Sequence, residues 1–66
     1  MDWINPNDTV LITRTDPENG LIVAVSLTLL GTYRVTFRDT DAGQTIETRV
    51  FNSAARAGDY AASLVS

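Results

Sequence analysis

Three of the chain's five arginines, Arg34, Arg38 and Arg49, fall within residues 33–51, "YRVTFRDTDAGQTIETRVF". A guanidinium group donates hydrogen bonds in a planar fork that fits carboxylates and phosphates. The stretch reads as two short strands joined by a tight turn, with apolar residues alternating with polar ones. Successive side chains of a strand point to opposite faces, so we expect the arginines to share the polar face, with Thr36 beside them.

The core-facing residues of this hairpin indicate its register. Placing Phe37 opposite Ile46 keeps the apolar side chains together, and the same register places Arg34 opposite Arg49. Like charges directly opposite each other destabilise a sheet, although Glu47, diagonal to Arg34, would bridge the pair. Two interpretations follow: a solvated face whose Arg–Glu network contributes about 0–1 kcal/mol, or an anion-accepting face that binds a partner.

Other chemistry finds little support in the sequence. Cysteine and histidine are absent, which excludes disulfides, the usual zinc and haem ligands, and a thiol or imidazole base. Asp39 and Asp41 in "RDTDAG" superficially suggest a calcium loop, but the stretch lacks the length and terminal glutamate of an EF-hand. There is no glycine-rich phosphate loop and no Ser–His pair. We therefore expect no metal, no cofactor and no enzymatic activity.

Four runs rich in β-branched and aromatic residues supply the elements that would position these side chains. Turn-forming residues separate them: "TDPENG" at 15–20, Gly31, and "TDAG" at 40–43. Turns this short favour antiparallel neighbours in chain order. The predicted strands span about residues 9–14, 21–29, 32–39 and 44–51.

The period then changes to that of a helix over residues 53–65. In "NSAARAGDYAASLVS", apolar residues recur every three or four positions. Asn52 or Ser53 can cap the first turn by accepting a backbone hydrogen bond. A stripe of small side chains lets a helix lie close to a sheet. The predicted stripe consists of Ala54, Ala57, Ala61 and Leu64.

These elements predict an α+β fold with two layers, β-β-β-β-α, in which a four-stranded antiparallel meander carries a C-terminal helix on one face. We expect a single domain over residues 1–66, with a lead-in at 1–8, the sheet at 9–51 and the helix at 53–65. The two-residue period of each strand selects the face that the helix covers. The expected core-facing residues are Val10, Ile12, Leu21, Val23, Val25, Leu27, Leu29, Tyr33, Val35, Phe37, Ile46 and Val50.

The other face of the first two strands is also apolar. Four side chains would point outward there: Leu11, Ile22, Ala24 and Leu30. A cluster of exposed apolar side chains, unlike a single one, calls for a cover. Either Trp3 and Ile4 of the lead-in fold back over it, or a partner or second copy of the chain covers it.

Composition limits the class of protein. The chain has 66 residues, 44% of them hydrophobic and 20% charged, which is typical of a small globular domain. A core this small provides on the order of 3–5 kcal/mol of stability. Without cysteine or a metal site, oligomerisation is the common reinforcement that remains. The N-terminus does not resemble a signal peptide, and the longest apolar-leaning stretch, "LIVAVSLTLLG", is too short to cross a bilayer. We expect a cytoplasmic protein that does not bind membranes.

The net charge of −3 argues against non-specific nucleic-acid binding by the whole surface. Our first hypothesis is a non-enzymatic protein-binding module that acts through its open sheet face, of the kind that phages and mobile elements use as inhibitors or accessory proteins. The second is a nucleic-acid-binding module that uses Arg34, Arg38 and Arg49 of the sheet face, and the layout is similar to that of small sheet-reading DNA-binding domains of the integrase arm-binding type. A structural assembly subunit is the third. The candidate partner-binding residues are Arg34, Arg38, Arg49, Thr36, Leu11, Ile22 and Leu30.

Overall fold

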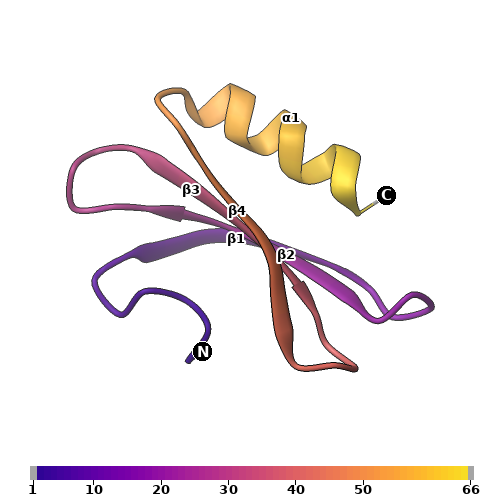
Figure 1. The fold of residues 1–66 in the computed structure, drawn as a ribbon. Helices are drawn as coiled ribbons and strands as arrows, with labels where there is room; N and C mark the ends of the chain where they lie inside the picture. Colours follow the sequence, from indigo (N-terminus) through magenta and orange to yellow (C-terminus); the bar gives the residue numbers. More distant parts are fainter. Residues whose placement is uncertain (1, 66) are drawn as a thin grey trace.

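A computed structural model describes residues 2–65 of the chain. It contains one open antiparallel sheet in the order β1-β2-β3-β4, with a C-terminal helix on one side (Figure 1). The predicted α+β meander with its helix is confirmed. No helix of residues 2–65 is long and apolar enough to cross a membrane. The elements are β1 (Thr9–Asp16), β2 (Leu21–Leu27), β3 (Tyr33–Asp39), β4 (Gln44–Phe51) and α1 (Ala54–Leu64).

The core lies between α1 and the two central strands. Its buried members are Val23, Val25, Val35, Ala57, Ala61 and Val65. Ser53 caps the helix, because its side chain accepts a hydrogen bond from the Arg56 backbone N–H at 3.3 Å. Alanine at the contact positions of α1 lets the helix approach the sheet closely. Of the predicted stripe, Ala54 is exposed and Leu64 half-buried, and Val65 takes the end of the stripe instead.

Gly20 ends the β1–β2 turn in a conformation that favours glycine, with a φ of +64°. A β-branched side chain at this φ is strained, and its Cβ would also meet the Asp41 carboxylate. We expect Gly20→Val to lower the free energy of unfolding by more than Glu18→Ala, whose side chain is exposed. Urea denaturation of the two variants measures the difference. Equal effects would contradict this account of the turn.

The β2–β3 connection turns earlier than the sequence predicts. β2 ends at Leu27, and the backbone N–H of Thr28 donates to the Thr32 carbonyl at 2.9 Å. Their side-chain hydroxyls also hydrogen-bond at 2.6 Å. Leu29 therefore lies in the connection with 79% of its surface exposed, and its predicted place in the core is wrong.

The register of β4 differs from the predicted one by one residue. Phe37 pairs with Glu47 rather than with Ile46, because a bulge leaves Ile46 without a direct partner. A slip of one residue moves every side chain to the other face. The predicted core positions of Ile46 and Val50 are therefore wrong: 53% and 55% of their surfaces are exposed.

β1 contributes less to the core than predicted. A bulge between Val10 and Ile12 places them in rows with Ser26 and Val25, which lie on opposite faces of the sheet. Both side chains are exposed, so their predicted burial is wrong. The central strands meet the expectation better, since Val25 and Val35 are buried, while Phe37 is half-buried at the sheet's helix side.

The lead-in crosses the face of the sheet opposite α1 (Figure 1). Ile4 is buried, as are Ala24 and Thr36 on that face of the central strands. Two local hydrogen bonds shape the lead-in, from the backbone N–H of Asn7 to the Asn5 side chain and from that of Asp8 to the Asn5 carbonyl. The lead-in of the same chain therefore covers the centre of this face, which is one of the two arrangements that the sequence left open.

Candidate interaction surface

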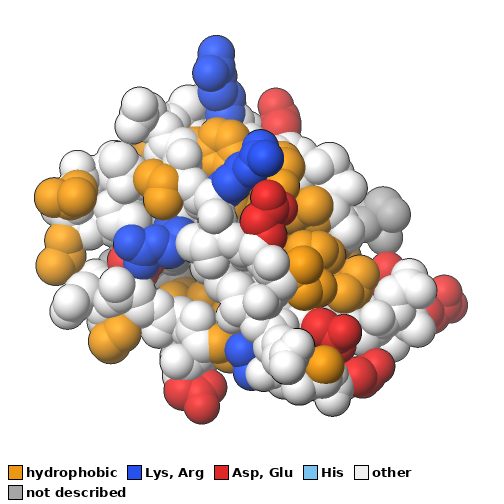
Figure 2. All heavy atoms as spheres, viewed as in Figure 1, with side chains coloured by type: hydrophobic (Ala, Val, Ile, Leu, Met, Phe, Trp, Pro, Cys, Tyr) orange, Lys and Arg blue, Asp and Glu red, His pale blue; other side chains and the backbone are white. Residues whose placement is uncertain are grey.

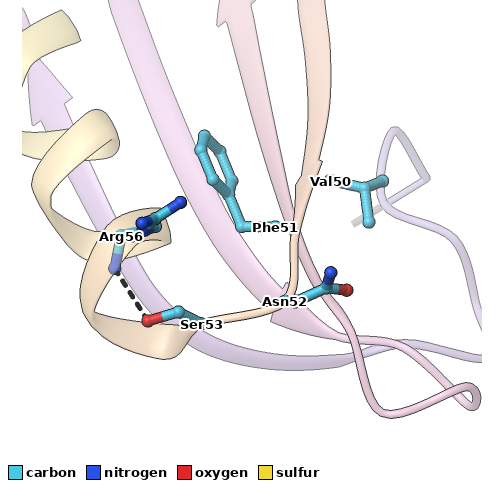
Figure 3. Close-up of a pocket in the computed structure, with 5 residues that line it drawn as sticks. All are labelled: Val50, Phe51, Asn52, Ser53 and Arg56. Atoms are coloured by element: carbon cyan, nitrogen blue, oxygen red, sulfur yellow. Dashed lines mark hydrogen bonds between the residues drawn. The ribbon is translucent and has the colours of Figure 1, made fainter.

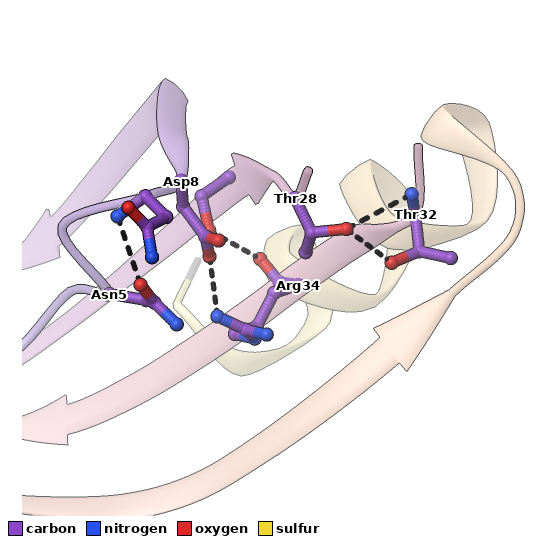
Figure 4. A network of polar contacts seen from close by, with 7 residues as sticks. Asn5, Asp8, Thr28, Thr32 and Arg34 are labelled. Carbon is purple, nitrogen blue, oxygen red and sulfur yellow. Dashed lines mark hydrogen bonds and ion pairs between the residues drawn. The ribbon is translucent and has the colours of Figure 1, made fainter. Parts of the chain in front are cut away.

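Arg34 is held by an acidic residue of the lead-in. Its Nη1 lies 2.7 Å from Asp8 Oδ2, and the hydroxyl of Ser26 donates to the same oxygen at 2.9 Å (Figure 4). The Asp8 side chain is 2% exposed and that of Arg34 is 27% exposed. This arginine therefore joins the lead-in to the sheet, and its fork already has a carboxylate.

Arg49 lies on the other face, beneath the helix. The β4 register places it opposite Val35, so Arg34 and Arg49 do not face each other and their predicted pairing is wrong. Its guanidinium carbon lies 4.9 Å from the ring centroid of Tyr60, and its Nε lies 3.3 Å from Glu47 Oε1. The Tyr60 hydroxyl donates to the other Glu47 oxygen. These contacts join β4 to α1.

The Tyr60–Glu47 hydrogen bond makes stability depend on pH. It is the main cause that raises the pKa of Tyr60 above its ordinary value of 10.0, because the bond favours the protonated phenol. A group with a raised pKa stabilises the fold below its unfolded pKa and ceases to do so as pH rises through the folded pKa.

We expect the parent to melt at a higher temperature than Tyr60→Phe at pH 7, because the variant lacks the hydrogen bond to Glu47. This difference should shrink above pH 10, where the phenol loses its proton. Thermal melts of both proteins across this pH range measure it. Tyr33→Phe is the control, since Tyr33 lacks this hydrogen bond to Glu47. A difference between parent and Tyr60→Phe that stays constant to pH 11 would argue against the role assigned to the hydroxyl.

Arg38 has a third environment. Its Nη2 donates to the Gly43 carbonyl at 2.9 Å, which closes the β3–β4 turn. Its guanidinium carbon also lies 5.7 Å from the ring centroid of Trp3, within the range of cation–π attraction. The three arginines of the hairpin thus have different neighbours: Arg34 contacts the lead-in, Arg38 the β3–β4 turn and Arg49 the helix.

The remaining candidates divide by exposure. Thr36 is buried and Ile22 is half-buried beside the lead-in. Leu11 and Leu30 are 51% and 91% exposed. The structure therefore leaves the two leucines at the surface, whereas the lead-in encloses the centre of the face that carries the threonine.

The two leucines belong to a larger group at one end of the sheet. Val10 on β1 and Val50 on β4 lie at the two ends of one row of paired residues, with Ser26 and Arg34 between them. The β2–β3 connection lies just beyond this row, and hydrophobic side chains gather at the corresponding margin of Figure 2. We call this group the apolar end: Val10, Leu11, Leu29, Leu30 and Val50.

The apolar end contains five of the seven large hydrophobic side chains that are exposed among residues 2–65. Burying a leucine side chain fully is worth about 1.5–3 kcal/mol. A concentration of apolar surface that polar groups border is typical of an interaction site. This end is consequently the strongest candidate for a contact surface.

Acidic side chains gather at the opposite end, where the β1–β2 and β3–β4 turns meet (Figure 2). The Thr40 backbone N–H donates to the Gly20 carbonyl at 2.7 Å and joins the two turns. Within residues 2–65 no group of three or more acidic side chains is placed to hold a metal ion. We call this group the acidic end: Asp16, Glu18, Asp39 and Asp41.

A shallow hollow of about 460 Å³ adjoins the apolar end where β4 leads into α1. Val50 and Phe51 line it from opposite faces of the strand, and Asn52, Ser53 and Arg56 complete it (Figure 3). The Arg56 side chain is exposed there. The hollow thus brings one cation to the border of the apolar end.

Comparison of the chain with protein-family models, with curated proteins and with solved structures finds no match. The assignment of a contact surface therefore depends on the geometry of the chain alone.

Sequence reasoning missed two residues that shape this surface. Asp8 lies 26 residues from Arg34, and no short-range pattern indicates their pairing. Tyr60 lies beside the predicted helix stripe and was given no role, yet it contacts Glu47 and Arg49 beneath the helix. A tyrosine one helix turn after Arg56, with a Glu-x-Arg pair on the preceding strand, is the signal that could have indicated it.

Proposed function

We propose that this chain is a small non-enzymatic protein-binding module whose contact surface is the apolar end. The observation that carries the proposal is the exposure of adjacent leucines at the tip of the β2–β3 connection, 79% for Leu29 and 91% for Leu30. Side chains of this kind are costly to leave in water, and their burial in a partner supplies much of the energy of association.

The connection that presents these leucines is ordered by its own hydrogen bonds. The Thr32 backbone N–H donates to the Thr28 hydroxyl at 3.2 Å, and the Gly31 N–H donates to the Thr28 carbonyl at 3.1 Å. A preorganised loop loses little conformational freedom on binding. This order supports a role in contact rather than an irregular connection without function.

The arginines do not support the nucleic-acid alternative. Phosphate binding requires cations that point to one surface. Arg34 and Arg49 lie on opposite faces and each has a carboxylate partner. The phage or mobile-element origin stays a prediction of the sequence.

Photo-crosslinking in the cells that make the protein tests the proposal. A benzophenone amino acid in place of Leu30 should crosslink to a discrete protein, and the same group in place of Ile46 should not. Ile46 is the matched control because its side chain is 53% exposed and lies outside the apolar end. Equal crosslinking from both positions, or crosslinking from Ile46 alone, would refute the assignment.

A further inference from the structure

We propose that the partner of the apolar end is a second copy of this chain, related by a two-fold axis so that two apolar ends meet. This inference rests on the proposed function and names its partner. Such an arrangement is isologous: each copy contributes the same residues, and the contact closes on itself.

The exposed area fits a small dimer. The five side chains of the apolar end are between 39% and 91% exposed. These fractions correspond to about 500 Å² of surface per copy, hence about 1,000 Å² in a pair, which reaches the lower limit of a specific interface. We therefore expect a weak dimer that forms only at high protein concentration.

The charge distribution favours this orientation. The acidic end lies at the far side of the sheet, so a pair joined at the apolar ends keeps the acidic ends of both copies far apart. At the apolar end Arg34 is neutralised by Asp8, and Arg56 adds a cation at the border. Two chains of net charge −3 thus meet away from their acidic ends, which lowers their mutual repulsion.

The polar groups inside the apolar end do not oppose burial. Between Val10 and Val50 the row contains Ser26 and Arg34, and both donate to Asp8. Ser26 is already fully buried in the single chain, so a contact here covers only the exposed part of Arg34, whose hydrogen bond to Asp8 stays in place.

Pairing of β1 edges is not the basis of this dimer. The bulge between Val10 and Ile12 interrupts the outer ladder of β1. In the regular part of the strand, an axis through Arg14 would bring two like charges together. The β2–β3 connection and the row of paired residues behind it provide the contact surface of the proposed dimer instead.

Sedimentation equilibrium from 10 µM to 2 mM tests the proposal with the protein itself. We expect the mass to rise from 7.2 kDa toward twice that value and no further. Leu29→Ser with Leu30→Ser should keep the monomer mass throughout, at an unchanged melting temperature for dilute protein. Ile46→Ser, which removes a similar exposed side chain elsewhere, should dimerise as the parent does.

The ionic strength distinguishes apolar from ionic contacts. Raising NaCl from 50 to 500 mM should leave the parent dimer as strong or stronger, because the contact is apolar and salt screens the repulsion between copies. A dimer that salt dissolves, or a mass that grows beyond two copies through apolar-to-acidic contacts, would overturn the two-fold arrangement.

A parent protein that stays monomeric at 2 mM would also overturn it. In that case the proposed function still stands or falls by crosslinking at Leu30, where a different protein would be captured. Dimerisation of the double leucine variant at the parent's strength would refute the inference even if the parent is a dimer.

Discussion

Asp8→Ala should lower the free energy of unfolding by about 2–3 kcal/mol. Removing one partner of a buried ion pair costs about 3–5 kcal/mol, and the 27% exposure of Arg34 lets water recover part of this loss. The carboxylate also accepts a hydrogen bond from Ser26, which is buried. A loss of this size is most of the stability of so small a domain. Urea denaturation at pH 7 measures it.

A double-mutant cycle with Arg34→Gln isolates the ion pair. We expect Arg34→Gln to destabilise as well, because it removes the group that Asp8 holds rather than a repulsion with Arg49. The double variant should lose less than the sum of the single variants. Asp2→Ala is the control, since Asp2 is exposed in the same lead-in. Additive single effects would show that the pair contributes nothing specific.

Val35→Ala should cost about 2–3 kcal/mol, and Val50→Ala less than about 0.5 kcal/mol. The two residues lie on neighbouring strands and lose the same two methyl groups. They differ in burial, since Val35 is 1% exposed in the core and Val50 is 55% exposed on the other face. Thermal melts of the two variants compare these losses of stability, and the comparison shows which side chain of β3 and β4 is buried against α1.

The Val50 result decides between two registers. If Val50 faced α1, as the alternation of β4 predicts, its truncation would leave a cavity and cost as much as that of Val35. A Val50→Ala variant as destabilised as Val35→Ala would contradict the register in which Glu47 and Arg49 lie beneath the helix.

Turn chemistry and helix period were sufficient to predict the fold. Gly20, Gly31 and Gly43 have positive φ values, and each lies between two strands of the meander. Ser53 caps the helix within the predicted choice of two residues. These signals are local, which is why the element order and the position of the helix follow from the sequence.

The faces of the edge strands could not be predicted, because they depend on two bulges. A bulge at Ile46 moves β4 by one residue, and one between Val10 and Ile12 divides β1 between two faces. The bulge in β4 accompanies a tertiary contact, the approach of Tyr60 to Glu47 and Arg49. Such contacts override strand alternation and join residues of different elements, so the alternation of a single strand does not indicate them.

The candidate site was predicted in part for the same reason. Leu11 and Leu30 are exposed as expected, although Leu30 lies in the β2–β3 connection and not on a strand face. Val50 and Leu29 were assigned to the core and are exposed instead. The arginines dominate the sequence pattern, but in the structure Arg34 and Arg49 form ion pairs with Asp8 and Glu47. Arg38 donates a hydrogen bond to the β3–β4 turn.

Amide chemical shifts of uniformly labelled protein, recorded from 2 mM down to 20 µM, test most directly whether the apolar end is the contact surface. We expect the shifts that change on dilution to belong to residues 9–11, 28–32 and 49–51, with the acidic end unchanged. Changes centred on Arg38 and the β3–β4 turn, or shifts that are constant at every position, would contradict self-association through the apolar end.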